Sequence, residues 1–162
     1  YKDEHGNSNI RKVEPHESKN FSDYYRANFK TIYDFAKTSN SKLSTVDNCV
    51  RFANMGRLIL ESHARSNYRL EYATSSAITQ LMKFYNISEE KEEEFQGMLD
   101  VINSLSHGLS FYDIDINQIS PREIRDAIRK LISIMFSYDK NHVIAMIGLA
   151  DDSKTLAEIE SW

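Results

Sequence analysis

The sequence is poor in the residues that mark β-rich, disulfide-bonded or membrane-spanning proteins. Its 162 residues include five glycines, two prolines and one cysteine, Cys49. Few glycines and prolines favour long helices over a turn-rich β fold. A single cysteine excludes an internal disulfide and argues against a small secreted scaffold. The longest largely apolar runs, such as 131–136, are far shorter than the ~20 residues that span a bilayer.

Motifs for metal and nucleotide binding are also missing. The sequence contains neither C-x-x-C nor H-E-x-x-H, so it predicts no metal site and no cofactor. It has no G-x-x-x-x-G-K-[ST] motif, so it cannot hold nucleotide phosphates in a P-loop. The net charge of −4 argues against a broad duplex-DNA binder but allows a local basic site. No signal peptide is visible, and we expect a cytoplasmic location without a membrane partner.

The residues that are present point to a helical globular domain. Hydrophobic residues make up 41% and aromatic residues 11% of the chain, enough for one sizeable core. Ser120-Pro-Arg-Glu123 is a full capping box with proline at the first helical position. Apolar periodicity predicts helices at about 22–38, 45–66, 71–85, 89–106, 120–138 and 142–149. We therefore predict an all-α fold, a compact bundle of five or six helices.

The two ends of the chain differ from this helical region. Residues 1–15 are typical of two short strands around a turn near Gly6-Asn7. Because two strands alone are marginally stable, we expect a small N-terminal β-hairpin that, with its linker at 1–19, completes the sheet of an absent domain. Residues 20–150 form the predicted helical domain, and 151–162 are interpreted as a polar C-terminal tail.

The predicted 45–66 helix carries a charged pair at its centre. Arg57 projects from an apolar stripe, and Glu61 lies one turn further on. An arginine keeps its proton, so in a largely apolar helix it must be paired or open into a cleft. The pair is therefore either a helical salt bridge, worth roughly 0.2–0.5 kcal/mol when exposed, or part of a functional site. The stripe consists of Val46, Val50, Ala53, Leu60 and Ala64.

A second polar feature lies at the end of the predicted 89–106 helix. Asn103 and His107 are one helical turn apart, on a different face from the apolar residues of that helix. A histidine at a helix C-terminus commonly caps the last carbonyls. Next to Gly108, the same histidine is also placed where a general acid or base could reach a substrate.

These residues carry a resemblance to a known family. Asn-Met-Gly-Arg-Leu-Ile-Leu-Glu at 54–61 and Ile-Asn-Ser-Leu-Ser-His-Gly at 102–108 resemble the C-terminal region of RloC/PrrC-like ABC-type ATPases. That family includes the anticodon nucleases of bacterial phage defence. Its proposed ribonuclease triad, an Arg-x-x-x-Glu pair and a later histidine, corresponds to Arg57, Glu61 and His107. The resemblance covers most of the chain.

The region is also similar to the HEPN ribonuclease superfamily. There, an Arg-Asn-x-x-x-His motif ends a helix and catalysis needs no metal. This chain matches the motif at Asn103 and His107 but has Ile102 in place of the arginine, so the cationic role would fall to Arg57. The resemblance implies a HEPN-like toxin domain at 20–150.

The implied activity is metal-independent cleavage of RNA, such as a tRNA anticodon stem-loop, by attack of the ribose 2′-hydroxyl. That reaction needs a base, an acid for the leaving oxygen and a cation for the phosphorane charge. His107 and Glu61 fit the two proton-transfer roles, in an order that the sequence leaves open. Arg57 fits charge stabilisation. Candidate phosphate contacts are Asn103, Arg65, Arg69, Arg122, Arg125 and Arg129.

Two alternatives stay open at this point. The three arginines at 122, 125 and 129 share one helix face that also holds Asp126, so they could simply form a solvated surface. The domain could also be a non-catalytic helical regulatory or dimerisation module of an ABC-type ATPase.

The resemblance implies partners as well. These are a homodimer and an ABC-type ATPase core, in cis or in trans. The 142–149 helix is apolar nearly all round and must be buried, either in its own bundle or against a partner.

Overall fold

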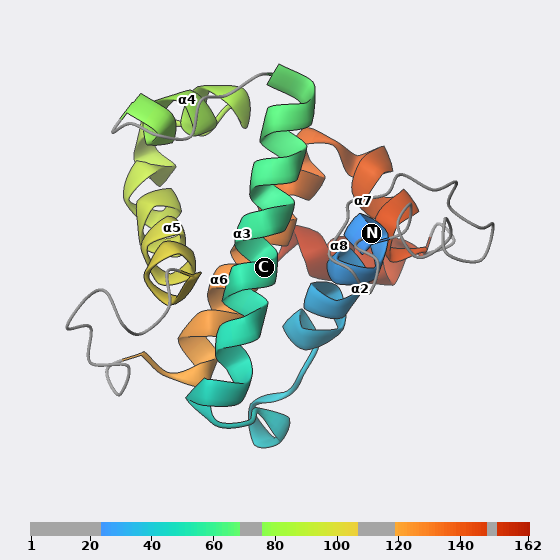
Figure 1. Ribbon diagram of the computed structural model, residues 1–162. Coiled ribbons are helices and arrows are strands. Elements are labelled where there is room, and N and C mark those ends of the chain that lie inside the picture. The colour runs from blue at the N-terminus through green and yellow to red at the C-terminus, as the bar shows by residue number, and fades with distance from the viewer. Residues whose placement is uncertain (1–23, 69–75, 107–118, 149–151) are drawn as a thin grey trace, which may run out of the picture.

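A computed structural model describes residues 24–68, 76–106, 119–148 and 152–162 (Figure 1). Every regular element in these ranges is helical, which confirms the predicted all-α class for this part of the chain. The predicted hairpin at 1–19 lies outside the described residues. The helices are α2 Tyr24–Ala36, α3 Val46–Tyr68, α4 Ser76–Phe84, α5 Glu92–Ser106, α6 Pro121–Tyr138, α7 Lys140–Ile147 and α8 Ser153–Glu160, with short 3-10 turns η1 Asn40–Lys42 and η2 Glu89–Lys91.

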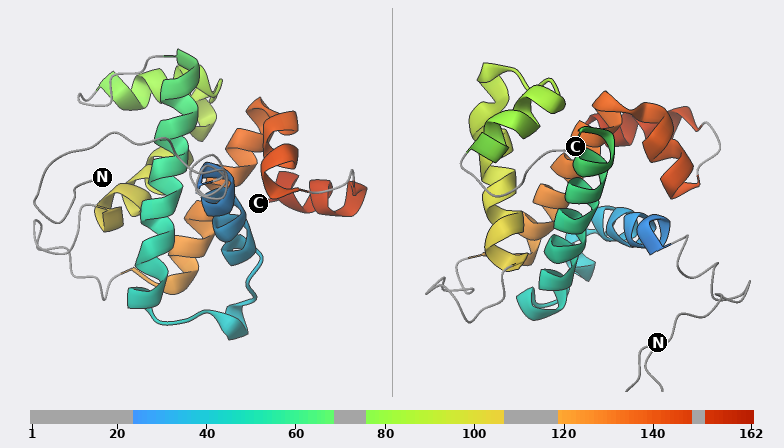
Figure 2. Two further views of the ribbon diagram at one scale, coloured as in Figure 1. Left: turned by 45° about the vertical axis from the view of Figure 1, so that its right-hand side comes forward. Right: turned by 45° about the horizontal axis from the view of Figure 1, so that its top comes forward.

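Helices α3 and α6 form the centre of the bundle. Both pack against α5 and α2 and against each other, and α6 also contacts α7 and α8. Figure 1 shows α3 as a long rod with α4 and α5 on one side and α2, α7 and α8 on the other. The two further views in Figure 2 show the same arrangement. The predicted charged pair therefore lies on the element that joins the two halves of the bundle.

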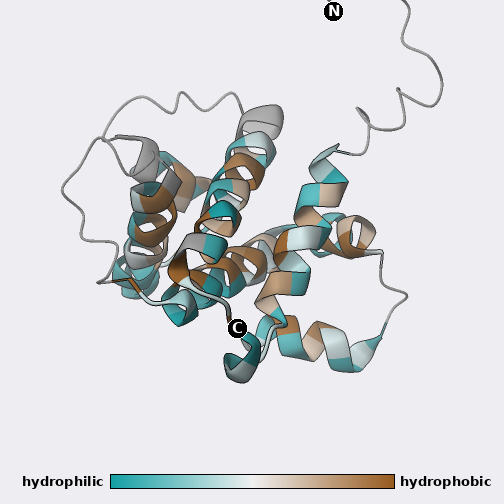
Figure 3. Cartoon of the chain, turned by 60° about the horizontal axis from the view of Figure 1, so that its bottom comes forward, coloured by the Kyte–Doolittle hydropathy of each residue, from teal (hydrophilic) through white to brown (hydrophobic). Residues whose placement is uncertain are grey.

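The core follows from the apolar faces of these helices. Figure 3 shows apolar residues gathered on the inner sides of the helices and polar residues on the outer sides. Gly56 lets α3 come close to α6, because a Cβ atom there would lie 2.6 Å from Ile128 Cδ1 and 3.3 Å from Leu131 Cδ2. The absence of a side chain at Gly56 thus leaves room for Ile128 and Leu131 of α6.

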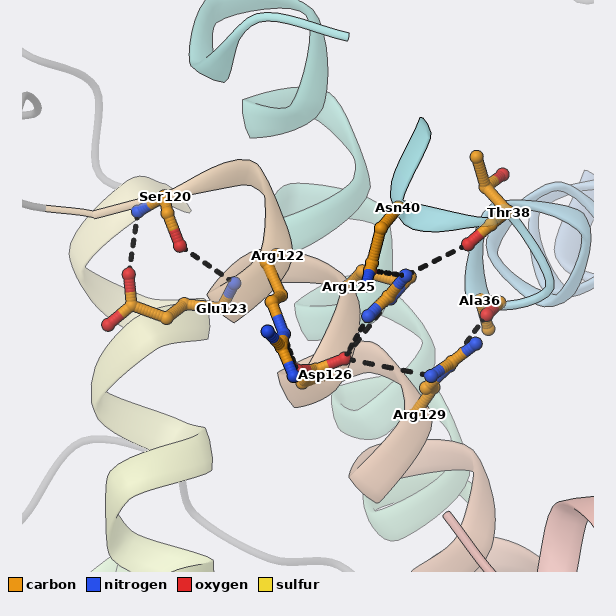
Figure 4. Close-up of polar contacts among 9 residues, drawn as sticks. All are labelled: Ala36, Thr38, Asn40, Ser120, Arg122, Glu123, Arg125, Asp126 and Arg129. Atoms are coloured by element: carbon orange, nitrogen blue, oxygen red, sulfur yellow. Dashed lines mark hydrogen bonds and ion pairs between the residues drawn. The ribbon is translucent and has the colours of Figure 1, made fainter. Parts of the chain in front are cut away.

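Local capping fixes where α6 begins. Ser120 Oγ accepts a hydrogen bond from the Glu123 backbone N–H at 3.2 Å, and the Ser120 N–H donates to the Glu123 carboxylate at 2.7 Å (Figure 4). With Pro121 at the first helical position, this confirms the predicted capping box. The helix runs on to Tyr138, as its apolar period predicts.

The C-terminal segment differs from the prediction. Residues 151–162 were expected to be a polar tail, but Asp152 caps helix α8, which buries Leu156 and Ile159 and packs on α6. The prediction was wrong because the average composition is polar, whereas the few apolar side chains share one helical face. The helical domain therefore extends past residue 150 to Trp162, which packs against the core.

Candidate functional site

Arg57 and Glu61 form an ion pair on the central turns of α3. Arg57 Nε lies 2.7 Å from Glu61 Oε1, and the side chains are 24% and 15% exposed. The pair is thus partly buried but reachable from solvent. Of the two possibilities predicted for Arg57, a paired state and an open cleft, the structure shows the pairing.

The turn that carries Arg57 lies against the last turns of α5. A Cβ atom at Gly56 would be 3.9 Å from Ile102 Cδ1, and α3 and α5 pack along their lengths. Arg57 directly follows Gly56 in α3, and Asn103 directly follows Ile102 in α5. Asn103 is half-buried. Helix α5 ends at Ser106. His107, the third member of the predicted triad, lies outside the described residues, so its approach to Arg57 and Glu61 stays a prediction.

Arg125 was predicted to contact phosphate, but it is buried, with a side chain 5% exposed. Its Nη1 donates to Thr38 O at 3.0 Å and to Asn40 Oδ1 at 2.7 Å, and its Nη2 donates to Asp126 Oδ1 at 2.8 Å (Figure 4). These bonds tie α6 to the connection between α2 and α3. Arg125 is thus held inside the structure by protein groups, and little of its guanidinium is accessible to a nucleic acid.

Arg129 and Arg122 have different surroundings, so the three arginines do not form a uniform basic face. Arg129 Nε donates to Ala36 O, at the end of α2, at 2.7 Å, and its guanidinium lies 5.6 Å from the centre of the Trp162 ring. A cation there is favourable because it meets the last carbonyls of a helix. Arg122 is 68% exposed and lies 3.6 Å from Asp126. Of the three predicted arginines, Arg125 is buried, Arg129 is partly exposed with 26% of its side chain accessible, and Arg122 is the most exposed.

The two remaining predicted contacts cannot be placed. Arg65 lies within α3, but its side chain is outside the described part of the structure, and so is the whole of Arg69. Their roles stay predictions.

Sequence reasoning missed a cluster of metal-ligating side chains. His63 of α3, Asp139 between α6 and α7, and His142 of α7 bring one ligand atom each to within 4.8 Å of one another. His63 is 3% exposed, and Asp139 and His142 are half-buried. The only local signal was Asp-x-x-His at a helix start, which is too short to predict a site.

Tyrosines orient both histidines of this cluster. His63 Nδ1 lies 2.9 Å from the Tyr85 hydroxyl, and His142 Nε2 lies 3.0 Å from the Tyr25 hydroxyl. Burial lowers the pKa of His63 from 6.5 to about 4, with a smaller contribution from His142. Burial also lowers the pKa of His142, opposed by the Asp139 carboxylate. Both imidazoles are therefore neutral at pH 7.

Comparisons with models of known protein families, with curated proteins and with solved structures found no match for this chain. Among the described helices, none is long and apolar enough to cross a bilayer.

Proposed function

We propose that this chain is a metal-independent endoribonuclease domain in which Arg57, Glu61 and His107 form the active site. One observation carries the proposal. The Arg57–Glu61 pair, at 2.7 Å and partly exposed, lies on the turn of α3 that packs against the Ile102 turn of α5. The first segment that resembles the nuclease family thus lies next to Ile102, the first residue of the second such segment.

The pair suits attack by a ribose 2′-hydroxyl. Arg57 supplies a guanidinium whose orientation is fixed by Glu61, so it can stabilise the charge of the phosphorane without reorganising. Glu61 accepts a hydrogen bond through Oε1, and we assign it the role of base for the hydroxyl proton. His107 then acts as the acid that protonates the 5′-oxygen leaving group.

The substrate and partners follow from the same family resemblance. We propose an anticodon-like RNA stem-loop as substrate and an ABC-type ATPase core, in cis or in trans, as regulator in phage defence. Asn103, Arg65, Arg69, Arg122 and Arg129 remain the candidate contacts to its phosphates. The net charge of −4 favours a small footprint, because a long duplex would meet more acidic than basic residues.

A matched set of α3 variants tests the site. Arg57→Gln and Glu61→Gln are compared with Arg51→Gln, an exposed arginine on the same helix. We expect cleavage of a stem-loop RNA in EDTA to fall about 10²–10⁴-fold in the first two variants and to stay at the wild-type rate in the third. Equal cleavage by all three proteins, folded as judged by circular dichroism, would remove the pair from the site.

The alternative is a non-catalytic regulatory or dimerisation module, and one observation favours it. The Arg57–Glu61 pair forms within a single helix and needs no ligand to be complete. In that case the Arg57 and Glu61 variants would lose only the ion-pair contribution to stability, and the wild-type chain would cleave no RNA.

We also propose a homodimer, on the evidence of α7. Val143 and Ile147 are buried in their own bundle, whereas Ile144 and Met146 are only half-buried and Ala145 is exposed. The apolar second half of α7 is thus only partly covered by its own bundle, and a second copy could cover the rest.

A further inference from the structure

We propose that His63, Asp139 and His142 form a binding site for a divalent transition metal ion of the Zn²⁺ class. The site is separate from the proposed nuclease centre and does not rest on it. Its three ligand atoms come from α3, from the junction of α6 and α7, and from the first turn of α7, and they lie within 4.8 Å of one another. The two imidazole rings have their centres 4.8 Å apart.

The hydrogen bonds of the cluster assign the ligand atoms. If His63 Nδ1–H donates to the Tyr85 oxygen and His142 Nε2–H to the Tyr25 oxygen, the ligating atoms are His63 Nε2 and His142 Nδ1. A ligating histidine usually donates its other N–H to an oxygen in this way, which fixes its tautomer and the direction of its ring. His63 Nε2 is buried, as a ligand atom facing a metal would be.

Asp139 supplies the third ligand from a fixed position. Its backbone N–H donates to Met135 O at the end of α6, and its Oδ1 accepts from the His142 N–H at 3.0 Å at the start of α7. The capping bond uses Oδ1, so we assign the metal to Oδ2. Because both the backbone and one carboxylate oxygen of Asp139 are already hydrogen-bonded, the side chain loses little conformational freedom on binding a metal.

The donor set selects the class of metal. Two imidazole nitrogens and one carboxylate suit Zn²⁺ and its first-row neighbours, whereas Mg²⁺ and Ca²⁺ prefer oxygen ligands alone. Tetrahedral Zn²⁺ with bonds of about 2.0–2.1 Å would place its ligand atoms about 3.3 Å apart. The ligand atoms, which now lie within 4.8 Å of one another, would have to draw together by side-chain rotation to reach this spacing. Three protein ligands leave one position for water or another ligand.

The surroundings allow the ion to enter and keep the ligands ready. Asp139 and His142 are half-buried rather than enclosed, which leaves a path from solvent. Tyr85, Tyr138 and Phe84 contact the His63 ring and shield it from water. A bound ion would clamp α7 to α3.

Metal-dependent stability of the full, tag-free chain tests the proposal. We expect Zn²⁺ at 100 times its Kd to raise the Tm of EDTA-treated protein by roughly 5–10 °C, and Mg²⁺ to have no such effect. Co²⁺ should give the visible absorption bands of a four-coordinate ion. These two readouts do not depend on ribonuclease activity, so they can fail without affecting the proposed function.

Matched variants locate the binding. Asp139→Asn keeps a good helix cap but loses the charged ligand, and Asp152→Asn makes the same change at the cap of α8. We expect His142→Gln and Asp139→Asn to lose most of the Zn²⁺-induced shift and the Co²⁺ bands, and Asp152→Asn to keep both. No Zn²⁺ shift in the wild type, or an equal shift in all four proteins, would overturn the proposal. If His142→Gln does not fold, the two aspartate variants decide.

Discussion

Replacing Gly56 by alanine tests how closely α3 packs on α6. In a helix interior, alanine is more stable than glycine by about 0.5–1 kcal/mol. At Gly56, however, the new methyl group would lie 2.6 Å from Ile128 Cδ1 and 3.3 Å from Leu131 Cδ2. Both neighbours are fully buried, and such overpacking typically costs about 1–3 kcal/mol. We therefore expect Gly56→Ala to lower the free energy of unfolding by about 0–2 kcal/mol, the low end applying if Ile128 can turn its terminal methyl aside.

Gly97→Ala is the matched control. Gly97 is an exposed residue inside α5, and a Cβ atom there would meet nothing within 4 Å. This variant should gain only the higher helix propensity of alanine, which should raise its free energy of unfolding by about 0.5–1 kcal/mol. Urea unfolding followed by circular dichroism gives both values, and their difference isolates the packing cost. If Gly56→Ala is as stabilising as Gly97→Ala, the close approach of α3 and α6 is refuted.

Three further predictions follow from the described contacts. Arg125→Met should lower the free energy of unfolding by roughly 2–4 kcal/mol because it removes buried hydrogen bonds, whereas Arg122→Met, at an exposed site, should change it by less than about 0.5 kcal/mol in the same urea assay. The capping bonds lower the pKa of Glu123 below its ordinary 4.5. Their stabilisation is therefore present above that pH and lost as the pH falls below it, so Glu123→Gln should flatten the acid side of the stability curve, and an unchanged curve would contradict this. Sedimentation at micromolar concentration should show a dimer that Met146→Glu weakens, and a wild-type monomer would refute dimerisation of this chain.

The sequence was sufficient for features that depend on neighbouring residues. Helical periodicity located α2, α3, α5 and α6. The structure also contains both hydrogen bonds of the capping box predicted at Ser120 and Glu123. These features are local, because apolar spacing and caps act within a few residues of the chain.

Features that depend on distant residues could not be predicted in this way. The burial of Arg125 depends on Thr38 and Asn40, which belong to another part of the chain. The approach of His63 to His142 depends on how α3 and α7 pack. Helix α8 was missed for another reason, since its few apolar residues are diluted by polar ones. No single stretch of sequence contains the information for the first two features.

The rate of RNA cleavage by His107→Ala tests the proposed function most directly. Wild-type protein and variant are given the same anticodon-like stem-loop RNA in excess EDTA, and cleavage is followed in a single turnover. The proposal predicts cleavage by the wild type that leaves a 2′,3′-cyclic phosphate, and a rate about 10²–10⁴-fold lower in the variant because the general acid is lost. Cleavage by folded His107→Ala at the wild-type rate would contradict it.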